Sequence, residues 1–461
     1  MRKILSFSFI LFLLYASVLT KSVRHVVASD CSKTSVGFLP LNALGAGLYK
    51  GKQGGLYPGG SNVRPAAHAN AGFQVARSVT TLDANGQPNA NGRIVLISVG
   101  MSNTTIEFST FKPMADADPA KNSKLVIVDG AQGGMSADRI SDLNTSSAQQ
   151  YWQTVDQRLS AAGVTPAQVQ IAWVKEADPG PTLAFPDDAL KVKDELANIA
   201  RILKTRYPNI RLTYYSSRIY AGYASSTLNP EPFAYQSGFS VKWLIEDQIN
   251  GSTDLNFDPS RGAVKAPWLA WGPYMWADGT TPRSDGVTWI CSDFQSDGTH
   301  PASSGAQKVA QMLLNFFKSD VTTQLWFVNA SSRTPSLLTR EDDVTRAVAL
   351  DSVTMMREPF SVVTLNNFSA DQRTRLMLFA FNLELLPGET SSAVTVQAED
   401  SSHRIYSLPV EYVGTVPGFD WMTQIVAKLP DEIANAGDMW LTISLRGAPT
   451  NKALVNIKAS P

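Results

Sequence analysis

The chain of 461 residues has few of the residues that usually build a metal site or a nucleic-acid surface. It contains four histidines, and its 40 Lys and Arg equal its 40 Asp and Glu, so the formal net charge is zero. This balance leaves no basic footprint for nucleic acid or for an anionic membrane surface. The histidines lie far apart in the sequence, which excludes zinc sites built on two histidines three or four residues apart, and no calcium-loop spacing occurs. We therefore expect no metal site, although one made of carboxylates alone stays open.

Long apolar runs are absent beyond the N-terminus. Met1-Arg2-Lys3 precedes the apolar run from Ile4 to Thr20, and the two together are typical of a secretory signal. The run is at the short end of the ~17–25 residues that a membrane-spanning helix needs, so residues 1–28 are predicted as a cleaved signal peptide, with an uncleaved anchor as the alternative. We expect a secreted, periplasmic or cell-surface protein without a membrane span after signal removal.

Cysteine is scarce as well, since only Cys31 and Cys291 occur. After export they could pair and tie the mature N-terminus to the loop that begins near residue 296. The sequence does not give the Cα distance that such a bond requires. Two free buried thiols are the alternative.

The middle of the chain alternates strand and helix patterns. Short continuous apolar runs are typical of strands buried on both faces of a parallel sheet, and helical periodicity extends over 147–163 and from Asp187 to before Pro208. This alternation predicts an α/β domain over 93–327, with an open, mainly parallel sheet flanked by helices. The predicted strands are RIVLISVG, SKLVIVDG, VQIAWV and IRLTYYS, which begin at Arg93, Ser123, Val169 and Ile210.

Different patterns lie on either side of this domain. Residues 29–92 are rich in Gly, Pro and Asn and predict an irregular N-terminal arm. Residues 328–343 are predicted as a linker, and short strand-like runs over 344–461 predict an all-β sandwich. This last region is similar to immunoglobulin-like modules appended to bacterial surface proteins. Its expected work is adhesion, spacing from the surface or carbohydrate contact.

The sequence SDGTHPASSGAQKVAQ, from Ser296 to Gln311, places Asp297 and His300 on a Gly-containing turn ahead of a helical pattern. The apolar face of this helix would fix the turn near a sheet edge. There His300 can act as a general base, and Asp297 can orient its imidazole and favour its charged form. The alternative is a turn stabilised by the aspartate with a bystander histidine.

Ser102 follows the first predicted strand, in VLISVGMSNTT. A serine at the carboxyl end of that strand lies where open α/β sheets bind ligands, and a helix that follows offers backbone N–H groups to an oxyanion. Read alone, Ser102 is a helix cap. Five Asn-x-Ser/Thr sequons occur in the chain, and the one at Asn103 must be unglycosylated if Ser102 is to react.

A strand-end serine early, Asp-x-x-His late and the glycine pair of DGAQGG between them resemble the layout of the SGNH, or GDSL-like, hydrolase superfamily over about 93–327. The most specific match is DGTHPASSGAQKVAQMLLNFF. The sequence GMSN is closer to the Gly-Gln-Ser-Asn form of sialate and carbohydrate acetylesterases than to Gly-Asp-Ser. The resemblance implies a three-layer α/β/α fold, with Ser102 as nucleophile, His300 as general base and Asp297 as its orienting partner.

The resemblance also assigns an oxyanion hole. The backbone N–H groups of Ser102 and of Gly133 or Gly134 would be donors. The family's remaining donor is an Asn or Gln side chain after the third strand, where this chain reads AWVKEADPGP. Lys175 occupies about the right place and could donate, and the alternative is a strand-end lysine paired with the acidic residue at 176 or 178.

These residues favour a secreted serine esterase that removes acetyl or another short acyl group from a saccharide and needs no cofactor. Trp271 and Tyr274 belong to an aromatic cluster that suits sugar rings, although clustered tryptophans are more often core. Arg218 could hold a substrate carboxylate, with a structural ion pair as the alternative. The rival function is a surface protein on the same scaffold that binds glycans or mediates adhesion without catalysis.

Overall fold

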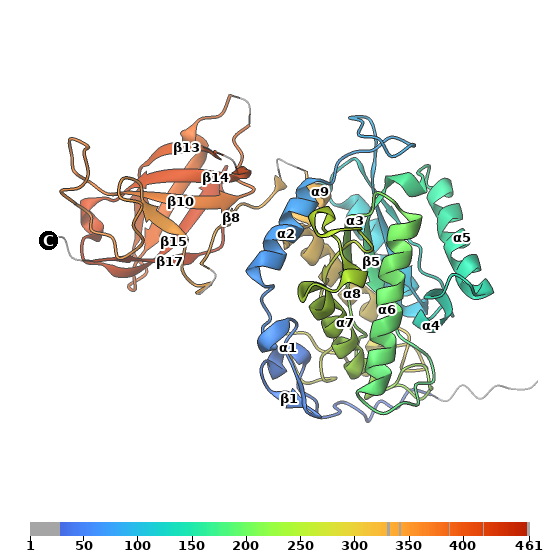
Figure 1. Cartoon of the computed structure of the whole chain (residues 1–461). Coiled ribbons are helices and arrows are strands. Elements are labelled where there is room, and N and C mark those ends of the chain that lie inside the picture. Colours follow the sequence, from blue (N-terminus) through green and yellow to red (C-terminus); the bar gives the residue numbers. More distant parts are fainter. Residues whose placement is uncertain (1–27, 330–331, 341–342, 387, 418, 459–461) are drawn as a thin grey trace, which may run out of the picture.

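The chain folds into two domains that lie side by side, each around its own apolar core (Figure 1). This computed structural model describes residues 28–329, 332–340, 343–386, 388–417 and 419–458. The predicted signal peptide therefore lies almost wholly outside the described residues. Within the described part, no helix has both the length and the apolar composition needed to cross a bilayer.

A five-stranded sheet forms the centre of the first domain, with strand order β4-β3-β5-β6-β7 and every neighbouring pair parallel. The four predicted strands are confirmed, and each is buried along nearly its whole length because helices cover both faces of the sheet. The strands are β3 (Ile94–Gly100), β4 (Leu125–Val128), β5 (Val169–Lys175), β6 (Leu212–Tyr215) and β7 (Trp268–Trp271).

Helices lie on both faces of this sheet and make three layers (Figure 1). Adjacent residues of β6 point to opposite faces: Tyr214 packs on Phe316 of α8, whereas the Tyr215 hydroxyl donates to the Leu196 carbonyl of α6. The predicted helices over 147–163 and from Asp187 are confirmed as α5 and α6. The helices of the domain are α1 (Leu41–Leu44), α2 (Ala66–Arg77), α3 (Ser102–Ala117), α4 (Ala137–Ile140), α5 (Ser146–Ala161), α6 (Asp187–Arg206), α7 (Phe233–Ile249), α8 (Ser303–Ser319) and α9 (Gln324–Phe327).

The N-terminal segment is more regular than its composition predicts. Residues 29–92 contain the 12-residue helix α2 and the short β1 (Leu48–Tyr49) and β2 (Lys52–Gln53), so the prediction of an irregular arm is wrong for this part. Helix α2 packs closely on the sheet at Gly72, where a Cβ atom would lie 2.1 Å from the Trp268 ring. The small residues that resembled a loop are those that allow this close approach.

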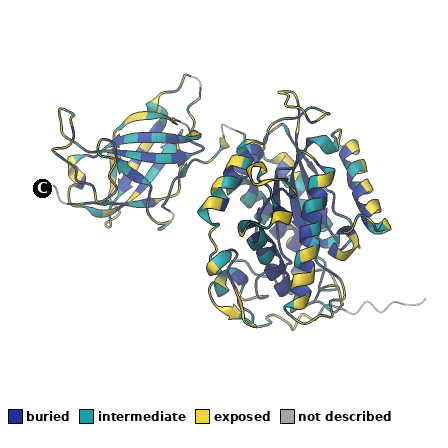
Figure 2. Cartoon of the chain, in the orientation of Figure 1, coloured by how far each residue is buried: buried dark blue, intermediate teal, exposed yellow. Residues whose placement is uncertain are grey.

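The second domain consists of two antiparallel sheets around one core, with orders β13-β14-β10-β8 and β12-β11-β15-β16. Strands β10, β11 and β17 alternate buried residues with partly or fully exposed ones, unlike the fully buried β3 (Figure 2). The strands are β8 (Ser336–Leu337), β9 (Ala349–Asp351), β10 (Arg375–Phe381), β11 (Val394–Glu399), β12 (Ile405–Leu408), β13 (Val410–Val416), β14 (Phe419–Lys428), β15 (Gly437–Leu445), β16 (Ala448–Pro449) and β17 (Ala453–Ile457).

The predicted linker, residues 328–343, is partly wrong, because β8 lies within it and already pairs with β10. The two domains also touch near this segment. Phe73 of α2 packs on Phe381 and Trp421 of the second domain, with ring centroids 5.0 and 5.3 Å apart. Apolar contacts therefore accompany the covalent connection between the domains.

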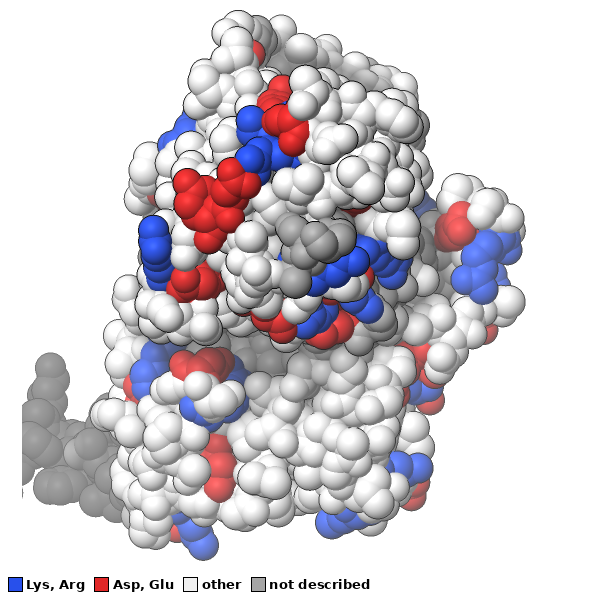
Figure 3. All heavy atoms as spheres, turned by 90° about the vertical axis from the view of Figure 1, so that its left-hand side faces the viewer, with Lys and Arg blue, Asp and Glu red and all other residues white. Residues whose placement is uncertain are grey.

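Positive and negative side chains lie next to one another on the face of the second domain that Figure 3 shows. The ion pairs of this domain include Arg375 with Asp371 and Glu411, and Arg346 with Asp438. Such pairing agrees with the zero net charge of the chain. It gives this face no extended patch of one sign.

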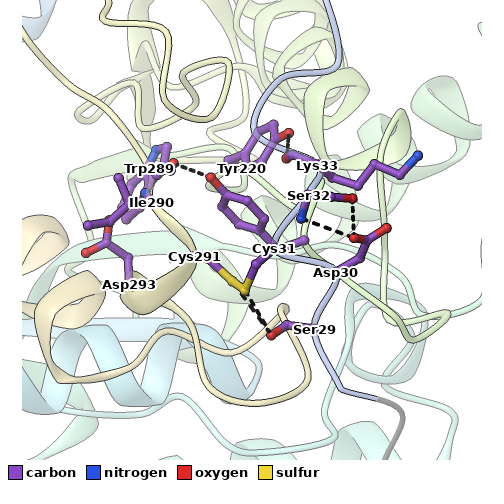
Figure 4. Close-up of a disulfide and its surroundings, with 11 residues drawn as sticks. Ser29, Asp30, Cys31, Ser32, Lys33, Tyr220, Trp289, Ile290, Cys291 and Asp293 are labelled. Carbon is purple, nitrogen blue, oxygen red and sulfur yellow. Dashed lines mark hydrogen bonds between the residues drawn. A yellow bond between two sulfur atoms is a disulfide. The ribbon is translucent and has the colours of Figure 1, made fainter.

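A disulfide joins Cys31 to Cys291, with a Cα separation of 5.3 Å (Figure 4). The alternative of two free thiols is therefore wrong. Beside the disulfide, the Ser29 amide donates to the Ser296 carbonyl at 2.7 Å, one residue before Asp297. The first described residues thus hold the loop that carries the Asp-x-x-His motif.

We expect the double substitution Cys31→Ser with Cys291→Ser to lower the free energy of unfolding by about 2–5 kcal/mol, because the crosslink between residues 260 apart in sequence constrains the unfolded chain. Urea unfolding without reductant measures the difference. Wild-type protein in reductant should match the double variant, and an unchanged unfolding midpoint in both would contradict a structural disulfide.

His68 gives the fold a predicted acid sensitivity. Its ring is buried, stacks on Trp268 with centroids 4.9 Å apart, and has Nε2 2.8 Å from the Leu269 carbonyl oxygen. Burial lowers the pKa of His68 to about 4. An unfolded histidine binds its proton near pH 6.5, so this contribution to stability is complete above that pH and is lost as the pH falls towards 4, by about 3 kcal/mol in total.

The substitution His68→Gln should therefore make the free energy of unfolding less dependent on pH between about 6.5 and 4.5. Denaturant titrations of both proteins at several pH values measure these slopes. Equal slopes for wild type and variant would show that His68 is not held neutral in the folded protein.

Candidate active site

Ser102 lies at a tight turn between a buried strand and a helix. Strand β3 ends at Gly100, Met101 is extended, and Ser102 begins α3. A Cβ atom at Gly100 would lie 2.3 Å from Thr104 Oγ1 and 2.6 Å from the Lys175 carbonyl oxygen, so only glycine allows this turn. The turn presents Ser102 at the carboxyl edge of the sheet, as predicted.

His300 and Asp297 reach this serine from the loop before α8. Ser102 Oγ and His300 Nε2 are 2.7 Å apart, and His300 Nδ1 and Asp297 Oδ2 are 2.5 Å apart. The other carboxylate oxygen, Asp297 Oδ1, accepts the backbone N–H groups of Thr299 and His300 at 3.0 Å. The structure thus brings the three predicted residues into one hydrogen-bonded chain.

The surroundings of Asp297 favour its ionised form. Partial burial opposes ionisation, but the hydrogen bonds from the His300 side chain and from the Thr299 and His300 amides outweigh it and lower the pKa of the carboxyl group. An ionised Asp297 accepts from Nδ1–H of the neutral imidazole and leaves Nε2 free to accept the Ser102 proton.

Asn103 helps to position His300 next to Ser102, a role that the sequence did not indicate. The side chain is buried, and its Nδ2 donates to the Thr299 carbonyl at 2.9 Å, which joins α3 directly to the His300 loop. A buried amide engaged in this way cannot carry a glycan in the folded protein. In the folded protein the sequon at Asn103 is therefore not accessible to glycosylation.

The glycine pair lies beside the serine on the loop after β4. Ser98 of β3 donates to Asp129 at 2.6 Å and accepts from the Gly130 amide, which holds the start of this loop. A Cβ atom on Gly133 would lie 3.9 Å from Ser102 Cβ. The amides of Gly133 and Gly134 donate to no described residue, so they are available to a ligand.

A pocket of about 300 Å³ opens at this edge of the sheet. Its walls come from the turn after β3, the loops after β4, β5 and β6, and the His300 loop. The residues that line it are Met101, Ser102, Asn103, Gly134, Ser136, Arg139, Asp178, Pro179, Arg218, Leu228, Asn229, Thr299 and His300.

Lys175 does not lie in this pocket, contrary to the expectation that it could donate to an oxyanion. Its side chain is fully buried, and Nζ contacts both carboxylate oxygens of Glu107 on α3 at 2.7 Å. The direction follows from strand geometry: Trp173 stacks on Phe108 of α3, so Lys175, two residues on, faces the same helix. The alternative prediction, which paired Lys175 with the acidic residue at 176 or 178, is wrong as well.

Burial dominates the electrostatics of this pair. It lowers the pKa of Lys175 to about 8, against the opposing effect of the Glu107 charge, and it raises the pKa of Glu107. Each group therefore depends on the other to stay ionised away from water.

Two predicted substrate-binding residues are parts of the core. Trp271 is the last residue of β7 and donates from its indole nitrogen to the Leu56 carbonyl at 2.7 Å, and Tyr274 accepts the Leu41 amide at 2.9 Å. Neither lines the pocket beside Ser102. Both residues belong to the buried core of the domain, as the alternative interpretation of the cluster expected, and their role in substrate binding gains no support from these contacts.

Arg218 does line the pocket, although its side chain is almost wholly buried. Its Nε and Nη2 atoms are closed off from solvent without a hydrogen-bond acceptor among the described residues. The alternative role of Arg218 was a structural ion pair. Within the described part of the chain, no carboxylate makes direct contact with its guanidinium.

Comparison of the chain with protein-family models, with curated proteins and with solved structures found no match. The described residues also contain no group of three His, Cys, Asp or Glu side chains placed to hold a metal ion.

A structural role for Lys175 predicts a specific pattern of stability. The substitution Lys175→Met should lower the free energy of unfolding by about 3–5 kcal/mol, because it leaves the Glu107 carboxylate buried without a partner. Adding Glu107→Leu should recover most of that loss. Urea unfolding of the two single variants and the double variant measures the coupling, and strictly additive losses would contradict the pairing.

Proposed function

We propose that the protein is a serine ester hydrolase with an SGNH-type arrangement of Ser102, His300 and Asp297. The observation that carries the proposal is the continuous hydrogen-bonded chain from Ser102 Oγ through both ring nitrogens of His300 to Asp297, at the wall of a pocket. A serine that only caps a helix would need neither a histidine at 2.7 Å nor an aspartate hydrogen-bonded to that histidine.

The proposed reaction is acyl transfer through a covalent intermediate. His300 Nε2 accepts the Ser102 proton while Oγ attacks the ester carbonyl carbon, and the carbonyl electron pair moves to oxygen as a tetrahedral oxyanion. When the oxyanion collapses, the bond to the alcohol breaks and the imidazolium gives its proton to the departing oxygen. A water molecule then repeats these steps on the acyl-enzyme and releases the acid.

Several backbone donors support this chemistry. The first N–H groups of α3, including that of Ser102, have no acceptor within the helix, and the Gly133 and Gly134 amides lie on the neighbouring loop without one. Donors of this kind stabilise the oxyanion because they are already oriented before the reaction. Their effect is largest where the protein excludes water. No step of this reaction requires a cofactor.

For the substrate we propose an ester of acetyl or another short acyl group, carried by a saccharide outside the cytosol. The pocket volume of about 300 Å³ suits a small acyl group, and the Cys31–Cys291 disulfide supports an oxidising compartment. The second domain is proposed as an immunoglobulin-like module for surface association. Leu365 and Phe368 are 86% and 92% exposed there, and exposed apolar side chains of this kind are common at contact sites.

The rival proposal of a non-catalytic glycan-binding protein loses its main support from these contacts. It relied on the aromatic cluster around Trp271 and Tyr274, whose rings are buried. It also relied on the altered sequence after the third strand, and Lys175 indeed supplies no donor to the pocket. The connected set of Ser102, His300 and Asp297 nevertheless favours catalysis.

Hydrolysis of p-nitrophenyl acetate by the mature protein tests the proposal. We expect Ser102→Ala to abolish turnover and Asp297→Asn to lower kcat by about 10²–10⁴-fold, since the asparagine amide disfavours the imidazole tautomer that accepts the serine proton. Ser109→Ala is a matched control, since Ser109 lies on α3 like Ser102 and its exposed hydroxyl donates to the Ile106 carbonyl rather than to His300. Turnover that survives Ser102→Ala would refute a serine mechanism.

A further inference from the structure

Because Lys175 pairs with Glu107, the end of strand β5 supplies no side-chain donor to the oxyanion. Lys175 is fully buried and holds both oxygens of Glu107, so it cannot turn to a ligand without breaking a buried ion pair. A second cation, Arg218, follows the neighbouring strand β6 and belongs to the wall of the pocket that contains Ser102 and His300.

The Arg218 guanidinium is buried without a hydrogen-bonded anion. Only 1% of the residue is exposed, and its backbone amide donates to Ser237 Oγ of α7 at 3.1 Å. No described residue accepts a hydrogen bond from the guanidinium, and Nε and Nη2 are closed off from solvent. Because the residue lines the pocket, Nη1 remains as the nitrogen that can meet a ligand there.

The carboxylates near Arg218 are committed to other groups. Glu107 is engaged by Lys175, and Asp297 by His300. Glu231 accepts the Trp276 indole N–H at 2.7 Å as well as two backbone amides. These charges keep the guanidinium cationic, but none of them occupies its donors.

Glu176, the remaining carboxylate near Arg218, has no hydrogen-bond partner for either side-chain oxygen among the described residues. Its side chain is buried, and this burial raises its pKa well above the usual range. A neutral Glu176 does not compete with a ligand for the Arg218 charge.

We propose that Arg218 is a catalytic residue that donates to the tetrahedral oxyanion formed at Ser102, in place of the side-chain donor that Lys175 does not supply. This inference rests on the proposed ester hydrolysis. The guanidinium has a charge and a donor that no described residue engages, at the wall of the pocket that contains Ser102. When the carbonyl electron pair moves to oxygen, this buried cation can stabilise the new negative charge, and such stabilisation is strongest where the protein excludes water.

The two side-chain amides that line the pocket are less suitable for this role. Asn103 donates from Nδ2 to the Thr299 carbonyl at 2.9 Å, and Asn229 donates from Nδ2 to the Asp178 carbonyl at 3.2 Å. Neither carries a charge to balance the oxyanion. Arg218 therefore combines the free donor and the positive charge that this step requires.

The test uses p-nitrophenyl acetate, which has no carboxylate, and separates kcat from KM. We expect Arg218→Met to lower kcat by about 10²–10³-fold with KM little changed, and Arg218→Lys to retain more activity because it keeps the cation. Arg211→Met is the matched control: Arg211 precedes the same strand at its opposite end and also has a buried Nε without an acceptor. Its kcat should equal that of wild type.

Three results would overturn the proposal. The first is an Arg218→Met kcat within about threefold of wild type on this substrate. The second is an effect confined to KM for carboxylate-bearing esters such as mono-p-nitrophenyl succinate, which would make Arg218 a substrate-binding group. The third is a wild type without Ser102-dependent turnover, which would remove the ester hydrolysis itself and is recognised by comparison with Ser102→Ala.

A measurement without variants covers the case in which the Arg218 variants fail to fold. A crystal structure of the Ser102 adduct with a p-nitrophenyl phosphonate contains a tetrahedral phosphorus whose oxygen mimics the oxyanion. We expect that oxygen within about 2.7–3.1 Å of an Arg218 nitrogen. An oxygen bound by backbone amides alone would refute the role of Arg218.

Discussion

A hydrogen bond of 2.7 Å between Ser102 Oγ and His300 Nε2 joins two segments that are 198 residues apart in the sequence. Much of the first domain can be understood as the support of that contact. The parallel sheet places Ser102 at its carboxyl edge, helix α8 fixes the far end of the His300 loop, and Asn103 links the loop to α3. The disulfide and the Ser29 amide hold the same loop from the N-terminal side.

Lys175 and Arg218 are two similar buried cations, and their different hydrogen-bond partners explain why they have different roles. Lys175 and Arg218 both follow or end central strands and both are buried, but the Lys175 ammonium contacts both oxygens of the Glu107 carboxylate and Arg218 has no carboxylate within hydrogen-bonding distance. A charge that is buried and unpaired costs several kcal/mol, which is tolerated mainly where function uses it. Lys175 therefore has a structural partner, whereas Arg218 has the features of a residue that acts on a ligand.

Much of this arrangement could be predicted from the sequence because its signals are local. Continuous apolar runs predicted four of the five parallel strands, and the spacing of Asp297 and His300 on a glycine turn predicted their contact. The fifth strand, Trp268–Trp271, is equally continuous and apolar, but its tryptophans were interpreted as a possible binding cluster. Helix α2 was missed because its small residues resemble those of a loop.

The direction of side chains could not be predicted, since it depends on contacts between distant segments. Nothing in AWVKEADPGP indicates that Lys175 contacts Glu107, which lies 68 residues earlier on helix α3. The pairing of Cys31 with Cys291 depended in the same way on a Cα distance that only the fold supplies. Asn103 showed only a sequon in the sequence, and its role as a link between α3 and the His300 loop needed the structure.

The most direct test of the central claim is the reaction of the mature protein with a fluorophosphonate probe, followed by intact-mass measurement and peptide mapping. We expect one phosphonyl group per chain, on Ser102, and we expect it to form far more slowly once His300 is replaced by alanine, because Nε2 no longer accepts the serine proton. An unmodified wild-type protein, or a label on another residue, would contradict a serine nucleophile at this site.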